Sequence, residues 1–147
     1  MMQSNSRLAV AIHILTLLSF REGGQITSEY IASSVVTNAV VIRRILGMLR
    51  KAGLVTSLKG NTGGWQLARP MDQISLLDAH AAVRPGPAIS LPPKEPNAKC
   101  CIGKGIRFAL METFDGVEKV MLDRLEQITI ADILSRVEAV ATSQPND

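Results

Sequence analysis

Residues 37–69 constrain this chain more than any other stretch, because they join a basic helical segment to a short glycine-rich hairpin. The stretch contains six Lys or Arg residues and no Asp or Glu. Its helical part runs from Asn38 to Ala52 and is followed by Gly53, a residue that commonly ends helices. A helix and a hairpin that carry one sign of charge favour a surface that binds a polyanion.

The charge of the whole chain is distributed unevenly between its halves. Residues 1–70 contain eight Lys or Arg and two Glu, a net of +6, whereas residues 71–147 contain eight basic and eleven acidic residues, a net of −3. This asymmetry favours a nucleic-acid module followed by an association or sensing module. Chance scatter of surface charge is the alternative, and the clustering within 37–69 argues against it.

The first half of the chain predicts a winged helix-turn-helix. Apolar residues at helical spacing predict a buried first helix over 7–20. Thr27 or Ser28 can cap a short second helix, and Asn38 can cap the third. The hairpin after the third helix would form the wing. The expected fold class is therefore mainly α with a small β wing, in which a winged helix-turn-helix domain precedes a long C-terminal dimerisation helix.

The predicted third helix separates into two faces. The core face comprises Ile42, Ile45, Leu46 and Leu49, and the opposite face comprises Val40, Arg44, Gly47 and Lys51. Arg44 thus points away from the core, as a residue that contacts DNA in a major groove must. Gly47 on the same face would allow the DNA backbone to approach closely. An ordinary solvated basic face is the alternative interpretation.

The hairpin places its polar and basic residues at its tip. Lys59 and Asn61 would lie there, within reach of phosphates or of a minor groove. Trp65 follows on the second strand, where we expect it to anchor the wing on the core rather than to stack on a base.

The second half predicts a short helix, a loop and a long helix. A helix capped by Ser75 should run to Val83, and a proline-rich, irregular loop should follow over 84–99. Apolar residues near heptad spacing then predict a dimer seam on a helix over 103–127, although packing against its own domain is the alternative. The expected seam comprises Leu110, Phe114, Val117, Met121, Leu125 and Ile128.

These boundaries predict three units. Residues 1–83 would form the DNA-binding domain, 84–102 a proline- and cysteine-containing loop, and 103–147 the dimerisation helices, the last of them over 130–140.

Several motifs together resemble the Rrf-type family of bacterial winged-helix regulators, which includes IscR, NsrR and CymR. They are Leu8-Ala9-Val10, Ile31-Ala32, Leu49-Arg50-Lys51-Ala52-Gly53-Leu54-Val55, the wing from Gly60 to Ala68, and Ile74-Ser75-Leu76-Leu77-Asp78-Ala79. The segments 5–13 and 38–44 resemble the branch that contains the Bacillus protein YwnA.

The apolar stretch over 8–20 is interpreted as a buried helix rather than a signal peptide, so the expected location is the cytoplasm. The resemblance implies a homodimer that binds a palindromic, double-stranded DNA operator, most simply as a repressor. The helix that begins at 37–38 would enter the major groove, and the wing would reach the adjacent minor groove. The expected DNA-binding set comprises Ser28, Thr37, Asn38, Val40, Arg43, Arg44, Gly47, Lys51, Lys59, Asn61 and Thr62.

The cysteines depart from the pattern of the cluster-binding members, which carry three spaced cysteines. This chain has two, the adjacent Cys100 and Cys101. Because a [2Fe–2S] cluster needs about four ligands, and the spacing of His13 and His80 gives no sign that they supply the rest, we expect no iron–sulfur cluster, no metal and no other cofactor. Nearby Lys99 and Lys104 favour a redox-sensing thiol, and an inert pair is the equal alternative.

Other function classes fit the sequence less well. An enzyme needs a general base oriented on its nucleophile, and no such constellation is visible. No apolar run reaches the roughly 18 residues of a membrane helix, so no membrane association is expected. A winged helix that docks an acidic protein partner without sequence-specific DNA binding remains the alternative function. The loop over 84–102 could also respond to a small-molecule or oxidant effector.

Overall fold

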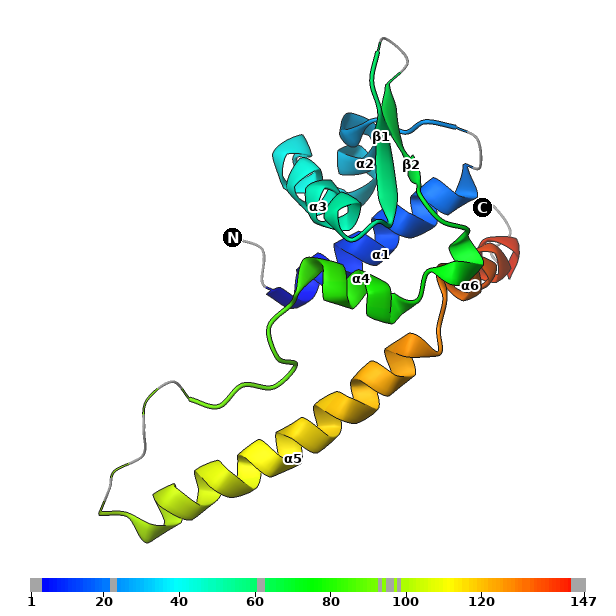
Figure 1. Ribbon diagram of the computed structural model, residues 1–147. Coiled ribbons are helices and arrows are strands. Elements are labelled where there is room, and N and C mark those ends of the chain that lie inside the picture. Colours follow the sequence, from blue (N-terminus) through cyan, green and yellow to red (C-terminus); the bar gives the residue numbers. More distant parts are fainter. Residues whose placement is uncertain are drawn as a thin grey trace.

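The computed structural model describes residues 4–21, 24–60, 63–92, 94, 97 and 99–143. The elements run in the order α1 (Ser4–Phe20), α2 (Ser28–Val35), α3 (Ala39–Lys51), β1 (Val55–Leu58), β2 (Gly64–Leu67), η1 (Met71–Gln73), α4 (Leu76–Val83), α5 (Cys101–Glu126) and α6 (Ile130–Ser143). In Figure 1, α1 to α4 and the hairpin form one body, and α5 lies apart from it as an arm. The predicted class, mainly α with a small β wing, is confirmed.

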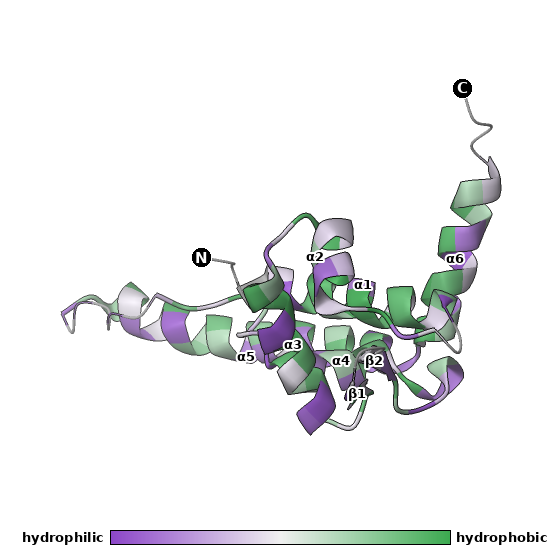
Figure 2. Ribbon diagram, turned by 90° about the horizontal axis from the view of Figure 1, so that it is seen from above, coloured by the Kyte–Doolittle hydropathy of each residue, from purple (hydrophilic) through white to green (hydrophobic). Residues whose placement is uncertain are grey.

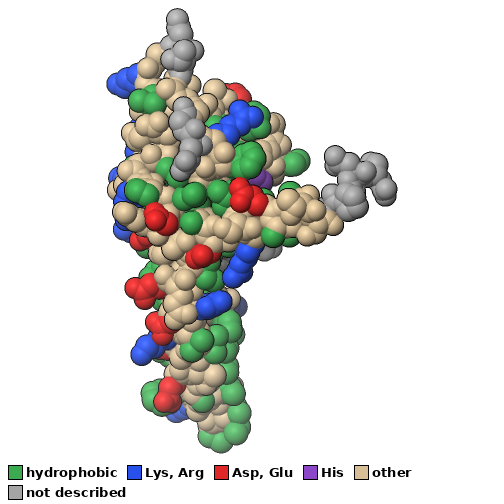
Figure 3. All heavy atoms as spheres, turned by 90° about the vertical axis from the view of Figure 1, so that its right-hand side faces the viewer, with side chains coloured by type: hydrophobic (Ala, Val, Ile, Leu, Met, Phe, Trp, Pro, Cys, Tyr) green, Lys and Arg blue, Asp and Glu red, His purple; other side chains and the backbone are tan. Residues whose placement is uncertain are grey.

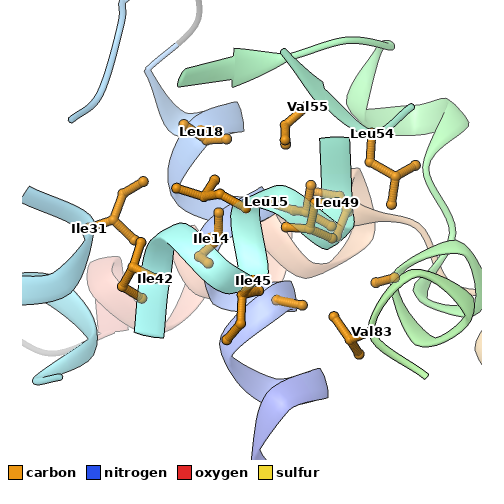
Figure 4. Close-up of a cluster of buried hydrophobic side chains, with 14 of the residues drawn as sticks. Ile14, Leu15, Leu18, Ile31, Ile42, Ile45, Leu49, Leu54, Val55 and Val83 are labelled. Carbon is orange, nitrogen blue, oxygen red and sulfur yellow. The ribbon is translucent and has the colours of Figure 1, made fainter. Parts of the chain in front are cut away.

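The core lies where α1, α3 and α4 meet under the base of the hairpin. Figure 4 shows Ile14 and Leu15 of α1 pointing toward Ile45 and Leu49 of α3, and all four side chains are at most 1% exposed. Figure 2 shows the same concentration of hydrophobic residues in the middle of the body. The predicted core face of α3 is thus confirmed, because Ile42 is buried as well.

Two side-chain caps set the helix-turn-helix. The Thr27 hydroxyl oxygen accepts the Tyr30 backbone N–H at 3.2 Å, and the Asn38 side-chain Oδ1 accepts the Val41 backbone N–H at 3.0 Å. Each cap satisfies a donor that has no partner within the helix. After α3, Gly53 has a φ of +73°, the left-handed conformation expected of the residue that follows a helix end.

The wing is a two-stranded antiparallel hairpin in which Val55 pairs with Leu67 and Leu58 with Gly64. Its second strand is also tied to the body, since the Trp65 N–H donates to the Ile26 carbonyl at 2.9 Å and the Ile26 N–H to the Trp65 carbonyl at 3.2 Å. A Cβ at Gly64 would lie 3.0–3.1 Å from atoms of Gln25 and Ile26. Glycine therefore allows the strand to approach the segment before α2.

The chain returns to the body after α5. The Leu76 N–H donates to the Ile128 carbonyl at 2.8 Å, and the Ile130 N–H donates to the Ile74 carbonyl at 2.9 Å. Ile130 is fully buried in the core, and α6 packs on α1. Within the expected unit over 103–147, α6 therefore packs on the body formed by the first half of the chain, whereas α5 extends from it as an arm.

Helix α5 is 26 residues long, and none of them is buried. It continues without interruption through Asp115 and Gly116. No single helix among the described residues has the length and apolar composition to cross a membrane; α2 and α3 pass that test only as a pair bent by 110°.

Candidate nucleic-acid interface

The face of α3 that is turned away from the core is open to solvent. Val40 is 63% exposed, Arg44 and Lys51 are exposed, and Gly47 between them is half-buried. The four residues follow one another along the free side of the helix, as the sequence predicts. This face can enter a groove as a unit because its backbone is held by the buried residues on its other side.

The wing stands beside this face. Lys59 and Gly60 near the tip are exposed, and Gly60 has a φ of +118°. Asn61 and Thr62 lie outside the described residues. Figure 1 shows the hairpin projecting from the body next to α3, so that a helix and a hairpin are available to neighbouring grooves.

Trp65 anchors the wing, as expected. Its ring is partly buried against the core, and the Arg50 guanidinium carbon lies 5.9 Å from the ring centroid. This cation–π contact joins the end of α3 to the second strand of the wing. The relative position of helix and wing is thereby fixed by a side-chain contact in addition to the short connection between them.

Arg43 is engaged within the protein. Its guanidinium Nη2 donates to the Glu29 carboxylate across α2 and α3, and both side chains are more than half exposed. The pKa of Glu29 is lowered mainly by a hydrogen bond from its own backbone N–H, with further contributions from the Ser28 hydroxyl and from Arg43. Arg43 must exchange or share this partner to contact DNA, whereas Arg44 has no ion pair among the described residues.

Ser28 differs from its expected place on the DNA-binding surface. It is only 7% exposed, and its hydroxyl donates to the Glu29 carboxylate at 3.2 Å, because the first turn of α2 faces the body. Thr37 is half-buried, and its N–H caps α2 by donating to the Ala32 carbonyl at 2.9 Å. Asn38 is exposed and holds the start of α3.

Sequence reasoning missed Val36, the residue between the two helices of the motif. Its side chain is 90% exposed, and its backbone is left-handed, with φ +60° and ψ +52°. A valine gives no sequence signal for this conformation, which normally favours glycine or asparagine.

The expected dimer seam on α5 lies largely on the side that faces the same chain. Phe114 lines a hollow with residues of the loop, Met121 lines another with Leu8 and His80, and Leu125 and Ile128 pack against the core. Leu110 is half-buried, whereas Val117 is 48% exposed.

A different stripe of α5 is free. Its positions alternate by four and three residues, which is the spacing of a coiled-coil seam. The free stripe comprises Ile102, Ile106, Ala109, Thr113, Gly116 and Val120. Its large members are 72%, 49% and 69% exposed at 102, 106 and 120. Figure 3 shows hydrophobic side chains gathered along one edge of the arm and charged ones along the other.

The two cysteines lie at the free end of the arm. Cys100 is the N-cap of α5, where its sulfur accepts the Gly103 N–H at 3.3 Å, and Cys101 is the first residue of the helix. Both are exposed. They are therefore accessible to solutes and stand at the opposite end of α5 from the DNA-binding body.

A helix-turn-helix with an exposed basic recognition face, a wing and a protruding helical arm together define a winged helix-turn-helix transcriptional regulator. The Rrf2 family model, described as "Iron-dependent Transcriptional regulator", matches residues 4–136. This chain therefore belongs to the Rrf2 family and is a DNA-binding transcriptional regulator, not an enzyme.

Known relatives agree over nearly the whole chain. The Bacillus subtilis (strain 168) protein named "Putative HTH-type transcriptional regulator YwnA" is 43% identical over 133 residues, covering 90% of this chain and 98% of that protein. A solved structure described as a "putative DNA binding protein" is 41% identical with a TM-score of 0.69, covering 87% of this chain and 98% of that one. Staphylococcus aureus CymR in its oxidized form is 25% identical with a TM-score of 0.61, covering 90% and 96%.

The family description names iron, but the residues of this chain do not fit an iron site. Its two cysteines are adjacent and exposed, and no group of three or more His, Cys, Asp or Glu side chains in the described residues could hold a metal ion. The His13 ring nitrogen is hydrogen-bonded to the Ser34 hydroxyl at 3.0 Å. The side chains of two consecutive residues diverge, so Cys100 and Cys101 cannot supply the converging ligands of a cluster.

Proposed function

We propose that this regulator is a homodimeric repressor that inserts α3 into the major groove of a palindromic operator and its wing into the adjacent minor groove. The observation that carries the proposal is the free face of α3, where Arg44 and Lys51 are exposed beside a basic hairpin. No acidic residue lies anywhere in 37–69 to oppose phosphate. A DNA-binding regulator of a bacterial chromosome acts in the cytoplasm, and we propose that location.

The first experiment identifies the operator. Genomic fragments retained by the full chain are sequenced, and the shared site is synthesised and measured by fluorescence anisotropy at several salt concentrations. Binding that weakens steeply with salt and a site with two inverted half-sites support the proposal. A chain that retains no DNA even at low salt would instead favour a winged helix that docks an acidic protein.

The second experiment tests the face of α3. Arg44→Ala should weaken operator binding by about 1–3 kcal/mol if the guanidinium contacts a base. Arg136→Ala is the matched control, because Arg136 is an exposed arginine on α6. Equal affinities of the Arg44 variant and the wild type would exclude α3 as the reading helix.

The free stripe of α5 supports the proposed dimerisation. An isolated amphipathic helix that exposes Ile102 and Val120 leaves apolar area in water, and pairing with a second copy removes it. The small residues Ala109 and Gly116 in the same stripe allow the two helices to approach closely. The stripe therefore supports an α5–α5 contact between two copies as the proposed dimer interface.

A charge in the free stripe tests this assignment. Val120→Asp should convert a dimer, of twice the 15.9 kDa chain mass, into a monomer in light scattering coupled to gel filtration. Met111→Asp is the control, since Met111 is 48% exposed on the opposite side of the helix. A dimer that survives Val120→Asp but not Met111→Asp would place the interface on the other side of α5.

We further propose that the chain works without an iron–sulfur cluster and that its thiols respond to peroxide. Attack of a Cys100 or Cys101 thiolate on peroxide breaks the O–O bond, oxidises the sulfur to a sulfenic acid and releases water after protonation. The exposure of both sulfurs and the oxidized form known for S. aureus CymR support this step. The double variant Cys100→Ser/Cys101→Ser should lose any peroxide effect on operator affinity; an unchanged effect would exclude the thiols.

A further inference from the structure

Val36 occupies a conformation that suits its side chain poorly. Its φ of +60° and ψ of +52° are left-handed, and a β-branched residue there is an outlier because its Cβ crowds the backbone. The position is needed to end α2, since the Val36 N–H donates to the Ser33 carbonyl at 3.3 Å and the Thr37 N–H to the Ala32 carbonyl at 2.9 Å. Glycine would meet the same requirement without strain.

Packing gives no reason for the valine. Its side chain is 90% exposed, more than that of any other large exposed hydrophobic residue described in the structure. The residue therefore brings strain and exposed apolar surface, and its side chain is almost entirely outside the packed body. Backbone strain at an exposed position favours a role in binding another molecule rather than in stabilising the fold.

Val40, four residues later, is a second exposed valine. It is 63% exposed on the second residue of α3, and Arg44 follows one turn further on the same face. Val36 and Val40 thus flank Asn38, the N-cap of the recognition helix, at the end of that helix from which base edges are usually contacted. Neither side chain can donate or accept a hydrogen bond.

We propose that Val36 and Val40 contact the C5-methyl groups of thymines in the operator and make this chain select thymine at those positions. The C5-methyl is the apolar group that thymine presents in the major groove, and apolar side chains recognise it by contact. The two valines are thus specificity-determining residues in addition to Arg44. The inference rests on the proposed insertion of α3 into the major groove.

Deoxyuridine tests the inference because it pairs like thymidine and lacks only the methyl group. Each thymine of the selected operator is replaced in turn, and the affinity of the full chain is measured by anisotropy. Loss of one buried methyl, about 0.8 kcal/mol, corresponds to a roughly fourfold weaker affinity. We expect this loss at one or two positions in each half-site.

Variants assign each sensitive position to a side chain. For one substituted position, Val40→Ala should bind the thymine and uracil operators with equal affinity. For a different position, Val36→Gly should show the same loss of preference. Val36→Gly should also melt at a higher temperature, because glycine relieves the backbone strain, so its loss of selectivity cannot be ascribed to unfolding. Val137→Ala, at a 51% exposed valine of α6, should keep the full thymine preference.

Two results would overturn the inference. Wild-type affinity that is the same for every uracil-substituted operator would show that no methyl is read, even though the proposed DNA binding stands. Thymine preference that persists in both valine variants would assign the reading to other residues. A chain that retains no genomic DNA in the operator selection would contradict both the proposed DNA binding and the inference that depends on it.

Discussion

Replacing Gly47 with alanine should stabilise the fold and weaken DNA binding at the same time. A Cβ built at Gly47 meets no heavy atom within 4 Å, so the methyl causes no clash in the free protein. Glycine in a helix interior costs about 0.5–1 kcal/mol relative to alanine. At this chain length the gain should raise the melting temperature by about 2–4 °C per kcal/mol.

The effect on DNA binding has the opposite sign. Gly47 lies between Arg44 and Lys51 on the free face of α3, where the proposed complex brings the helix against the groove. An extra methyl forced into a packed contact costs about 1–3 kcal/mol, which corresponds to roughly 5- to 150-fold in affinity. The melting temperature is measured by circular dichroism, and the operator affinity is measured by anisotropy on the same protein sample.

Gly105→Ala is the matched control for this variant. Gly105 is also a helical glycine with no heavy atom within 4 Å of a Cβ, but it lies on α5, far along the chain from the recognition helix. It should raise stability without changing operator affinity. A stabilised Gly47→Ala protein with wild-type affinity would refute close contact between this face and DNA, and a destabilised one would refute the packing of α3.

Two further substitutions test how the body is held together. Ser75→Ala removes the acceptor of the Asp78 N–H at 3.0 Å in the capping box of α4; the loss of about 1 kcal/mol should lower the melting temperature, and an unchanged value would exclude the cap. Asp132 accepts hydrogen bonds from the Thr129 N–H and hydroxyl, and the N–H is the main cause that holds its pKa below the ordinary 3.8. Because the folded pKa is the lower one, this stabilisation is complete well above pH 3.8 and is lost as the pH falls through the folded value. The melting temperature of Asp132→Asn should therefore lie further below that of the wild type at about pH 6 than at about pH 2.5; an equal difference at both would refute the role of the charge.

The recognition helix could be predicted from sequence because its determinants are local. Asn38 at its start, Gly53 after its end and the apolar spacing between them are each visible within a few residues, and the structure confirms the caps and the buried face. Trp65 was predictable as an anchor for a similar reason, since a strand with a large apolar residue next to a basic tip has one side available to the core.

Other features depend on contacts between distant segments. The ion pair of Arg43 with Glu29 requires the angle between α2 and α3, and the burial of Ser28 requires the placement of α2 on the body. On α5, Phe114 has suitable spacing for a seam, but spacing does not reveal that part of the loop, over 87–91, lies beside it. The free stripe could be identified only after the position of the loop was known.

The geometry of α5 also restricts how the thiols could control DNA binding. The helix has 26 residues, so it is about 39 Å long at roughly 1.5 Å per residue. Cys100 and Cys101 stand at one end, and the hydrogen bonds of Ile128 and Ile130 attach the other end to the body. The turn of α5 that carries the sulfurs is exposed, and the helix contacts the body near its other end, where Leu125 packs against the core.

We therefore propose that oxidation acts on DNA binding by changing how two α5 helices pair, which would alter the spacing of the two α3 copies on the operator. This reasoning predicts that the peroxide effect depends on the dimer. Val120→Asp, as a monomer, should bind a single half-site with the same affinity before and after peroxide, whereas the wild-type dimer should change its affinity for the full operator. A peroxide response that is equally large in the Val120→Asp monomer would show that the signal travels through one chain, and the pairing mechanism would then be wrong.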